Sequence, residues 1–141
     1  MHVQAYLFFD GRCEEALEFY RTTLDAELLM LLRYKDSPEP TQCPLPPGAE
    51  DKVMHSSFRI GATEVMASDG LCTGQPSFQG FALSLAVPNE AEAERRFQAL
   101  AEGGQVQMPL AKTFFSPSFG MVTDRFGVCW MILVAAEVPA A

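Results

Sequence analysis

The spacing of apolar residues near the N-terminus changes from that of a strand to that of a helix. Residues 3–9 are nearly all apolar, which is typical of a strand covered on both faces. Asp10 and Gly11 interrupt this run. The apolar side chains that follow recur at helical spacing and form one stripe, made of Cys13, Ala16, Leu17, Tyr20 and Leu24. We therefore predict a strand, a turn and an amphipathic helix.

Three further apolar segments follow this helix. Residues 26–34 predict a second strand, and residues 53–60 and 63–68 predict a hairpin that turns at Gly61. Between them, residues 36–50 contain five prolines and a glycine, which predicts a loop. A loop of this length is either a lid over a binding site or a surface insert with no role.

The same order of elements recurs in the second half of the chain. Residues 81–87 predict a strand, and Asn89 with Glu92 three positions later forms a capping-box pattern that starts a helix. Gly103 ends that helix. The remaining predicted strands of this half cover residues 105–110, 119–124 and 128–134.

This repetition predicts an α+β fold of two tandem βαβββ modules. We expect the modules to form a curved mixed sheet around a cavity, with the helices on the outer face. The 141 residues suit a single domain, which we place at residues 1–135. Module 1 covers about residues 1–69 and module 2 about residues 81–135, joined by a linker at 70–80, and residues 136–141 form a tail.

Composition and charge argue against several classes of binding partner. Apolar residues make up 48% of the chain, which argues against intrinsic disorder. The net charge of −8 offers no cationic surface for phosphates, so we expect no nucleic-acid partner. No apolar run approaches the roughly 20 residues of a membrane span. The N-terminal segment also lacks a basic leader before an apolar stretch. We therefore expect a cytoplasmic protein with no membrane partner.

Three segments of the chain resemble a known superfamily. They are YLFFDGRCEEALEFYRTTLDAELL, HSSFRIGATEVMASD and FFSPSFGMVTDRFGVCWMILV, and the TDRFGVCW core of the last is the most specific. Together they resemble the vicinal oxygen chelate superfamily, which includes glyoxalase I, extradiol dioxygenases and bleomycin- and fosfomycin-resistance proteins. Within it, the chain looks like the PhnB-like, demethylubiquinone methyltransferase-like branch.

The resemblance spans about residues 5–134 and implies paired βαβββ modules, a homodimer and a small-molecule ligand bound in the concavity of the sheet. The methyltransferase label gains no support from the sequence. A nucleotide-type cofactor site would need a glycine-rich strand-to-helix turn followed by an acidic residue, and the chain has none.

Enzymes of this superfamily hold a divalent metal with His, Gln or Glu in the first strand of each module and in the strand after each hairpin glycine. Aligned with this chain, the first-strand positions fall on Val3 or Ala5 and on Phe81 or Leu83. The positions after the hairpin glycines fall on Val65 and Met131. A shift of one residue in the alignment moves these last two to Met66 and Ile132, or to Glu64 and Trp130. Only Glu64 among them is a ligand for a hard cation, and one carboxylate does not make a site. We therefore predict no metal site and no cofactor.

His55 is the histidine best placed to contact a ligand. A two-residue turn in the hairpin pairs Arg59 with Glu64 and puts His55 on the polar side. Phe58 and Val65 then share the apolar side. Because the superfamily's ligand position maps onto Val65, this register points His55 away from the cavity, and a bulge or a one-residue shift reverses that orientation. The alternative role is that of a hydrogen-bonded structural histidine.

Three other side chains are candidates for ligand contact. Asp69 ends a strand, where it either anchors an amine or hydroxyl of a ligand or forms a turn. Arg33 lies at the end of the second strand, beside the proline-rich loop. There it either lines the opening of the ligand cavity or is a solvent-exposed strand end. Phe115 lies in an aromatic loop that is either a ligand contact or a dimer seam. The predicted ligand-binding residues are therefore His55, Asp69, Phe58, Val65, Arg33 and Phe115.

Three functions remain open. The favoured one is a metal-free binding protein that encloses a small, partly apolar molecule. The second is a lyase, isomerase or dioxygenase-type enzyme, with a non-standard metal site or an acid–base pair that includes His55 or Asp69. The third is a dimeric regulatory or interaction protein, in which the dimer surface matters more than the cavity.

Overall fold

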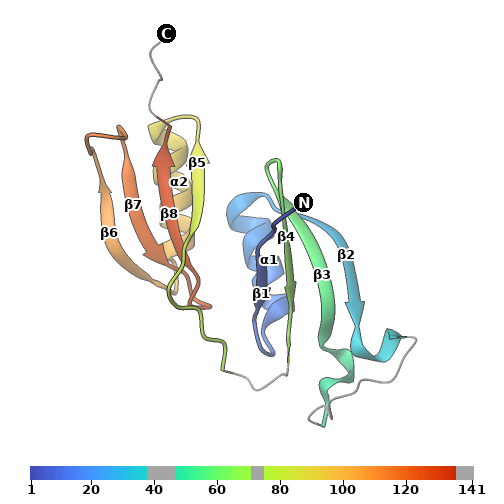
Figure 1. The fold of residues 1–141 in the computed structure, drawn as a ribbon. Helices are drawn as coiled ribbons and strands as arrows, with labels where there is room; N and C mark the ends of the chain where they lie inside the picture. Colours follow the sequence, from blue (N-terminus) through green and yellow to red (C-terminus); the bar gives the residue numbers. More distant parts are fainter. Residues whose placement is uncertain (38–46, 71–74, 136–141) are drawn as a thin grey trace. The chain divides into compact units, whose positions relative to one another are not determined.

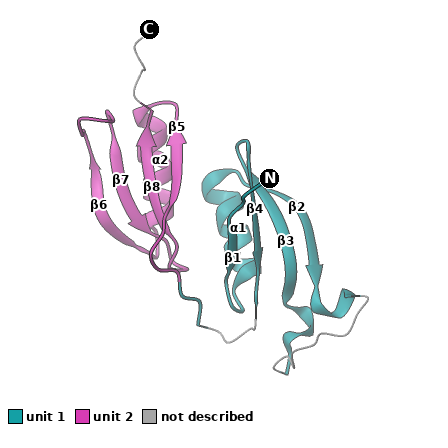
Figure 2. Ribbon diagram, in the orientation of Figure 1, with its two compact units in different colours: residues 1–77 teal, residues 78–141 magenta. Residues whose placement is uncertain are grey.

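The computed structural model describes residues 1–37, 47–70 and 75–135. Most of the loop predicted at 36–50 and the whole predicted tail lie outside these residues. Two compact units divide the chain, residues 1–77 (unit 1) and 78–141 (unit 2) (Figure 2). Within the described residues, each unit has one α-helix and one four-stranded mixed sheet, in the chain order strand, helix, three strands (Figure 1). The predicted tandem βαβββ modules are therefore confirmed.

Unit 1 is built on a sheet with the strand order β1-β4-β3-β2. Its strands are β1 (Tyr6–Phe8), β2 (Glu27–Arg33), β3 (Val53–Ile60) and β4 (Thr63–Ser68), and its helix is α1 (Cys13–Leu24). Strands β1 and β4 run parallel, whereas the other pairs are antiparallel. Short 3₁₀ helices at Tyr34–Asp36 and Ala49–Asp51 flank the undescribed part of the loop.

Helix α1 covers one face of this sheet. Its predicted apolar stripe is confirmed, because all five of its side chains are buried. The Tyr20 ring stacks on Phe58 with ring centroids 6.0 Å apart, and Cys13 Sγ lies 3.9 Å from Ser56 Oγ. Side chains alternate along a strand, so residues of the other parity lie on the opposite, helix-free face of unit 1. These are Tyr6, Phe8, His55, Ser57, Arg59, Glu64 and Met66.

Unit 2 repeats this arrangement with the strand order β5-β8-β7-β6. Its elements are β5 (Leu83–Val87), α2 (Glu90–Ala101), β6 (Gln105–Ala111), β7 (Phe119–Thr123) and β8 (Cys129–Val134). The predicted N-cap of the helix is confirmed, because the Asn89 side chain accepts a hydrogen bond of 2.9 Å from the backbone N–H of Glu92.

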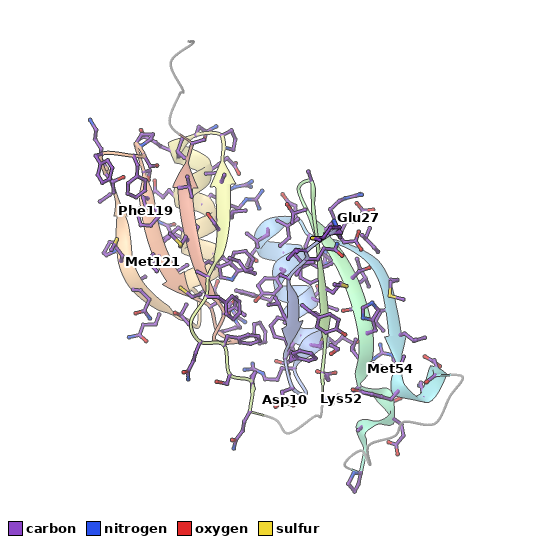
Figure 3. All side chains as sticks on the ribbon, viewed as in Figure 1. Asp10, Glu27, Lys52, Met54, Phe119 and Met121 are labelled. Carbon is purple, nitrogen blue, oxygen red and sulfur yellow. The ribbon has the colours of Figure 1, made fainter. Side chains whose placement is uncertain are left out.

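Helix α2 packs against the face of this sheet that carries Gly120. A Cβ atom at Gly120 would lie 2.8 Å from Phe97 Cε2, so the close approach of the helix requires glycine there. Phe119 and Met121 point to the other side of β7 (Figure 3). The helix-free face of unit 2 is centred on Met108, Phe119, Met121, Met131 and Leu133.

The first strand of each module is shorter than predicted. β1 covers only Tyr6–Phe8 because these are the residues that pair with β4, although Phe9 still donates a hydrogen bond of 2.8 Å to Ser68 O. Apolar character alone therefore overstated its length. Across residues 1–37, 47–70 and 75–135, the helices are too short or too polar to cross a lipid bilayer.

Candidate functional site

Two of the predicted ligand-binding residues lie beneath α1. Phe58 and Val65 are buried and pair with each other across β3 and β4. The hairpin register and the predicted sharing of one face by these two residues are thus confirmed, including the pairing of Arg59 with Glu64. The face they share is packed against the helix and forms the core of unit 1.

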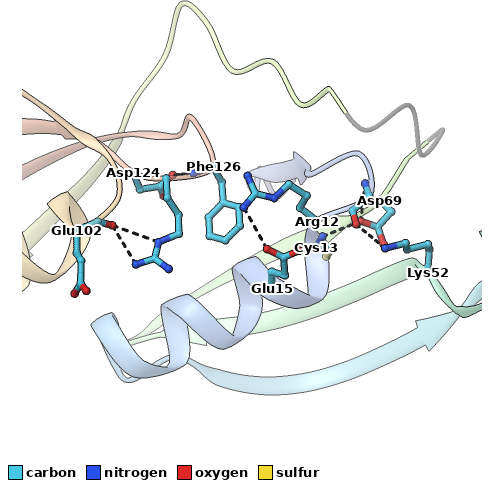
Figure 4. Close-up of polar contacts among 10 residues, drawn as sticks. Arg12, Cys13, Glu15, Lys52, Asp69, Glu102, Asp124 and Phe126 are labelled. Atoms are coloured by element: carbon cyan, nitrogen blue, oxygen red, sulfur yellow. Dashed lines mark hydrogen bonds and ion pairs between the residues drawn. The ribbon is translucent and has the colours of Figure 1, made fainter.

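Asp69 is also buried, and its carboxylate accepts three backbone hydrogen bonds. Oδ1 lies 2.9 Å from Gly11 N and 2.8 Å from Cys13 N (Figure 4). Oδ2 lies 2.7 Å from Val53 N. These bonds tie together the turn after β1, the first turn of α1 and the start of β3. The arrangement gives Asp69 a structural role, and its contact with a ligand stays a prediction.

The Cys13 thiol lies next to this carboxylate. Burial, reinforced by the negative charge of Asp69, raises the pKa of Cys13 to about 12. The thiol is therefore protonated at neutral pH, and it packs in the core as a small apolar side chain. This agrees with the core position that the helical stripe indicates.

Arg33 lines an open groove of about 710 Å³ beside α1, together with Lys35, Lys52 and several carboxylates. Its guanidinium pairs with Glu14 of α1 and donates to Asp51 O at 2.7 Å. The neighbouring Lys35 pairs with Asp51 at 2.8 Å. The Arg33–Glu14 pair keeps the pKa of Arg33 above its usual value. The groove is thus crossed by ion pairs within the chain.

His55 lies on the helix-free face of unit 1, where it forms a pair with Tyr6. The Tyr6 hydroxyl is 3.0 Å from His55 Nδ1, and the two rings stack with centroids 5.6 Å apart and an interplanar angle of 28°. β4 separates β1 from β3 in the sheet, so the pair reaches across that strand. The hydrogen bond and the ring contact fix the orientation of the imidazole.

The second ring nitrogen of His55 is available to a ligand. Nε2 makes no hydrogen bond to the residues that the structure describes, and His55 is half-buried rather than enclosed. When Tyr6 donates to Nδ1, Nε2 carries the proton and is a donor. The other tautomer leaves Nε2 as an acceptor. The site therefore offers one oriented hydrogen-bonding atom.

Apolar side chains lie next to this polar pair, whereas the charged Arg59 and Glu64 lie further along the same face. The Phe8 ring lies 4.9 Å from that of Tyr6 and is 57% exposed. Met66 is half-buried and pairs with Tyr6 on one side and with Ser57 on the other. Leu32, on β2, pairs with His55. A hydrogen-bonding centre within an apolar surface suits a small, partly apolar molecule.

Tyr6 and Phe8 were not among the ligand-binding residues predicted from the sequence. Residues 3–9 are apolar on both parities, so their sequence does not show which side chains share a face with His55. The parallel pairing of Tyr6 with Met66 settles this point. The predicted orientation of His55 assumed that the Val65 side faces the ligand, whereas α1 covers that side.

Phe115, the last predicted residue, belongs to unit 2. Its ring lies 5.0 Å from that of Phe119 and 5.1 Å from that of Phe114, both at steep angles. Phe115 is 43% exposed, and Phe119 beneath it is buried. The structure therefore places it in an aromatic cluster on the helix-free face of unit 2.

The side chains at the superfamily's metal positions do not fit a divalent metal. Of those positions, Val65, Leu83, Trp130 and Ile132 belong to the helix-covered faces. The helix-free faces carry Glu64, Met66 and Met131, which supply one carboxylate and two thioethers. Nor do any three His, Cys, Asp or Glu side chains cluster closely enough to hold an ion in the described ranges. We derive no chemistry through a metal.

Similarity to proteins of known sequence extends over nearly the whole chain. A family model described as 3-demethylubiquinone-9 3-methyltransferase matches residues 1–133. Protein YjdN from Escherichia coli (strain K12) is 37% identical over 145 residues, which cover 99% of each chain.

Solved structures agree with this match. Protein PA1353 from Pseudomonas aeruginosa is 44% identical, with a TM-score of 0.82 over 96% of this chain and 98% of that one. A putative 3-demethylubiquinone-9 3-methyltransferase, PhnB protein, from Bacillus cereus is 30% identical, with a TM-score of 0.79 over 96% and 100%. The fosfomycin resistance protein FosX from Mesorhizobium loti, 10% identical, shares the fold with a TM-score of 0.64 over 97% and 93%. The chain therefore belongs to the PhnB-like family described as 3-demethylubiquinone-9 3-methyltransferase, and it has the glyoxalase/bleomycin-resistance fold.

Proposed function

We propose that this protein binds a small, partly apolar molecule on the helix-free face of unit 1, without the metal of the superfamily's enzymes. The observation that carries the proposal is the Tyr6–His55 pair, which orients Nε2 in an apolar setting. An apolar surface with one or two fixed polar atoms is the usual composition of a small-molecule site. Fold similarity alone would not support this function, because one fold hosts many chemistries.

Methyl transfer, which the family description names, is not part of the proposal. The sequence has no glycine-rich turn for a nucleotide-type cofactor. The residues of the helix-free face instead supply a hydrogen bond and apolar contacts. Both are binding interactions that need no cofactor.

Isothermal titration against a panel of metabolites and antibiotics tests the proposal. We expect at least one compound to bind with a stoichiometry of one per chain. His55→Ala should then weaken its binding about tenfold, the effect of losing one buried hydrogen bond. Tyr6→Phe should weaken binding less, because the imidazole remains but loses its fixed orientation.

His2→Ala is the matched control, because His2 is the other histidine of the chain and is exposed. This change should leave the affinity unaltered. Equal affinities for the wild type, His55→Ala and Tyr6→Phe would place the ligand elsewhere and refute the proposal.

Proton transfer by His55 is a second candidate function. It is favoured by the hydroxyl–imidazole contact, because a hydrogen bond to Nδ1 sets the proton-carrying state of Nε2. In that case His55→Gln should retain binding of the substrate but abolish turnover. Turnover that survives this substitution would exclude the acid–base role while leaving the binding function intact.

A further inference from the structure

Two peptide bonds of the chain join an aspartate to a glycine, Asp10–Gly11 and Asp69–Gly70. Such a bond is open to isomerisation, because glycine has no side chain to keep its backbone nitrogen away from the preceding carboxyl group. The nitrogen attacks the carboxyl carbon, its proton leaves with the carboxyl hydroxyl as water, and a five-membered succinimide forms. Water then opens the ring at either carbonyl, which gives aspartate again or isoaspartate. One water is released and one is consumed, so the reaction needs no other reactant.

The first of these bonds lies in the turn between β1 and α1. Asp10 and Gly11 both have positive φ, 55° and 113°. The attacking atom of this bond, Gly11 N, donates a hydrogen bond of 2.9 Å to Asp69 Oδ1, and Lys52 Nζ donates one of 2.9 Å to Gly11 O. Ring closure requires Gly11 N to swing towards the Asp10 side chain, which breaks the bond to Asp69. The buried carboxylate therefore holds the nucleophile away from the group that it would attack.

In the second bond, the Asp69 carboxyl is itself the group under attack. It is 1% exposed, and the backbone N–H groups of Gly11, Cys13 and Val53 hold its two oxygens. The attacking atom, Gly70 N, donates to the side chain of Ser68 at 3.2 Å. The carboxyl cannot turn towards Gly70 N without losing its own hydrogen bonds, and burial excludes the water that would open the ring. The same carboxylate thus secures both bonds.

From these contacts, we propose that Asp10 and Asp69 are latent sites of isoaspartate formation, and that the Asp69 carboxylate protects both Asp–Gly bonds while unit 1 is folded. Isoaspartate at position 10 moves a methylene from the side chain into the main chain, which displaces Gly11 N from Asp69. The carboxyl that Gly70 N attacks then has one donor fewer. Modification at the first bond therefore promotes modification at the second. The proposal requires no ligand and is independent of the site around His55.

Ageing of the wild-type chain at neutral pH, folded in buffer or unfolded in urea, gives the first test. Trypsin cuts after Arg12 and Arg59, so the two bonds fall in separate peptides, and electron-transfer fragmentation distinguishes isoaspartate from aspartate in each. We expect isoaspartate to form at least about tenfold faster at both bonds in urea, the factor for loss of one hydrogen bond to a charged acceptor. Equal rates in the folded and unfolded chain would overturn the proposal. This comparison does not depend on the folding of any variant.

Asp69→Ala tests the carboxylate directly, because it removes the acceptor of Gly11 N and leaves Asp10–Gly11 as the remaining bond of this kind. Isoaspartate at position 10 should form about tenfold faster than in the wild type. Leu24→Ala is the matched control. Leu24 is a buried residue at the other end of α1, so its truncation destabilises the same unit and keeps every bond to Asp69.

The control should therefore change the rate at Asp10 far less. Equal acceleration by both variants would show that unfolding of unit 1, rather than the carboxylate, controls the reaction. Slower reaction in Asp69→Ala would make the carboxylate a base that assists the attacking nitrogen. Either result would overturn the proposal.

Discussion

At the scale of single residues, buried carboxylates organise a turn in each unit. Asp69 does so in unit 1. In unit 2, Asp124 accepts a hydrogen bond of 2.9 Å from Phe126 N (Figure 4). It also accepts bonds from Val128 N at 3.1 Å and Trp130 Nε1 at 2.9 Å. A buried charge is tolerated when several donors replace its water. Each of these two carboxylates has three such donors, so both stabilise the turns that hold their sheets in register.

Removing the Asp69 carboxylate should be costly. We expect Asp69→Ala to lower the free energy of unfolding by about 3 kcal/mol, because it leaves backbone N–H groups in the interior without a hydrogen-bond acceptor. Chemical denaturation measures this change. The control is Asp51→Ala, which removes an exposed ion pair with Lys35 and should change the free energy of unfolding far less. Equal losses in the two variants would contradict the structural role of Asp69.

The Cys13 thiol gives stability a pH dependence in the alkaline range. Its pKa is about 12 in the folded chain and about 8.5 when unfolded, so the folded state favours the protonated form. This contribution is fully present below about pH 8.5 and is lost as the pH rises towards 12. Between pH 9 and 11, the free energy of unfolding should therefore fall by up to about 1.4 kcal/mol per pH unit through this group.

Denaturation of the wild type and of Cys13→Ala at pH 9 and 11 measures this dependence. Other groups titrate in the same range, so the prediction concerns the difference between the two slopes. The variant should have the shallower slope. Identical slopes would mean that Cys13 ionises as easily in the folded chain as in the unfolded one.

At the scale of secondary-structure elements, the sequence predicted most of the fold. The hairpin of β3 and β4 has the predicted bounds, because strong alternation and a two-residue turn at Gly61 specify it locally. The side of the sheet that α1 covers was not predictable in the same way. It depends on how the helix crosses the sheet, which is a property of the tertiary structure.

The candidate site shows the same limit. His55 was identified because the chain has only two histidines, whereas Tyr6 was missed because its contact depends on the parallel pairing of β1 with β4. Val65 was placed towards the ligand through a superfamily position, and Phe58 because it shares that side of the hairpin; their contact with a ligand stays a prediction. A shift of one residue moves that position to the other face of the strand.

The N-cap of α2 should contribute measurably to stability. Asn89→Ala removes the acceptor for Glu92 N and should lower the free energy of unfolding by about 1 kcal/mol. Asn89→Asp keeps an acceptor and should cost much less. Thermal denaturation compares the two variants, and an equal loss in both would show that the capping bond does not stabilise the helix.

Close backbone packing after α2 leaves no room for a side chain at Gly104. A Cβ atom there would lie 2.2 Å from Thr123 O, so Gly104→Ala should lower the free energy of unfolding by about 3 kcal/mol. Gly61→Ala meets no atoms and should cost about 1 kcal/mol through its positive φ alone. A milder effect at Gly104 than at Gly61, measured by denaturation, would contradict this packing.

At the scale of the whole molecule, two units of one design differ in the chemistry of their helix-free faces. Unit 1 carries the Tyr6–His55 pair next to apolar side chains, and unit 2 carries methionines and phenylalanines. The repeat therefore preserves the architecture while the two faces take different side chains. Because their side chains differ, the two faces offer different contacts to a ligand. The homodimer implied by the family resemblance stays a prediction that light scattering can test.

The most direct test of the account is the ring-nitrogen NMR spectrum of His55 during titration with a compound that calorimetry shows to bind. Two histidines give few signals, and His2→Ala identifies those of His55. We predict that the Nε2 and Nδ1 resonances of His55 shift in proportion to occupancy, while those of His2 stay in place. Saturable binding that leaves both His55 resonances unmoved would contradict a ligand site on this face.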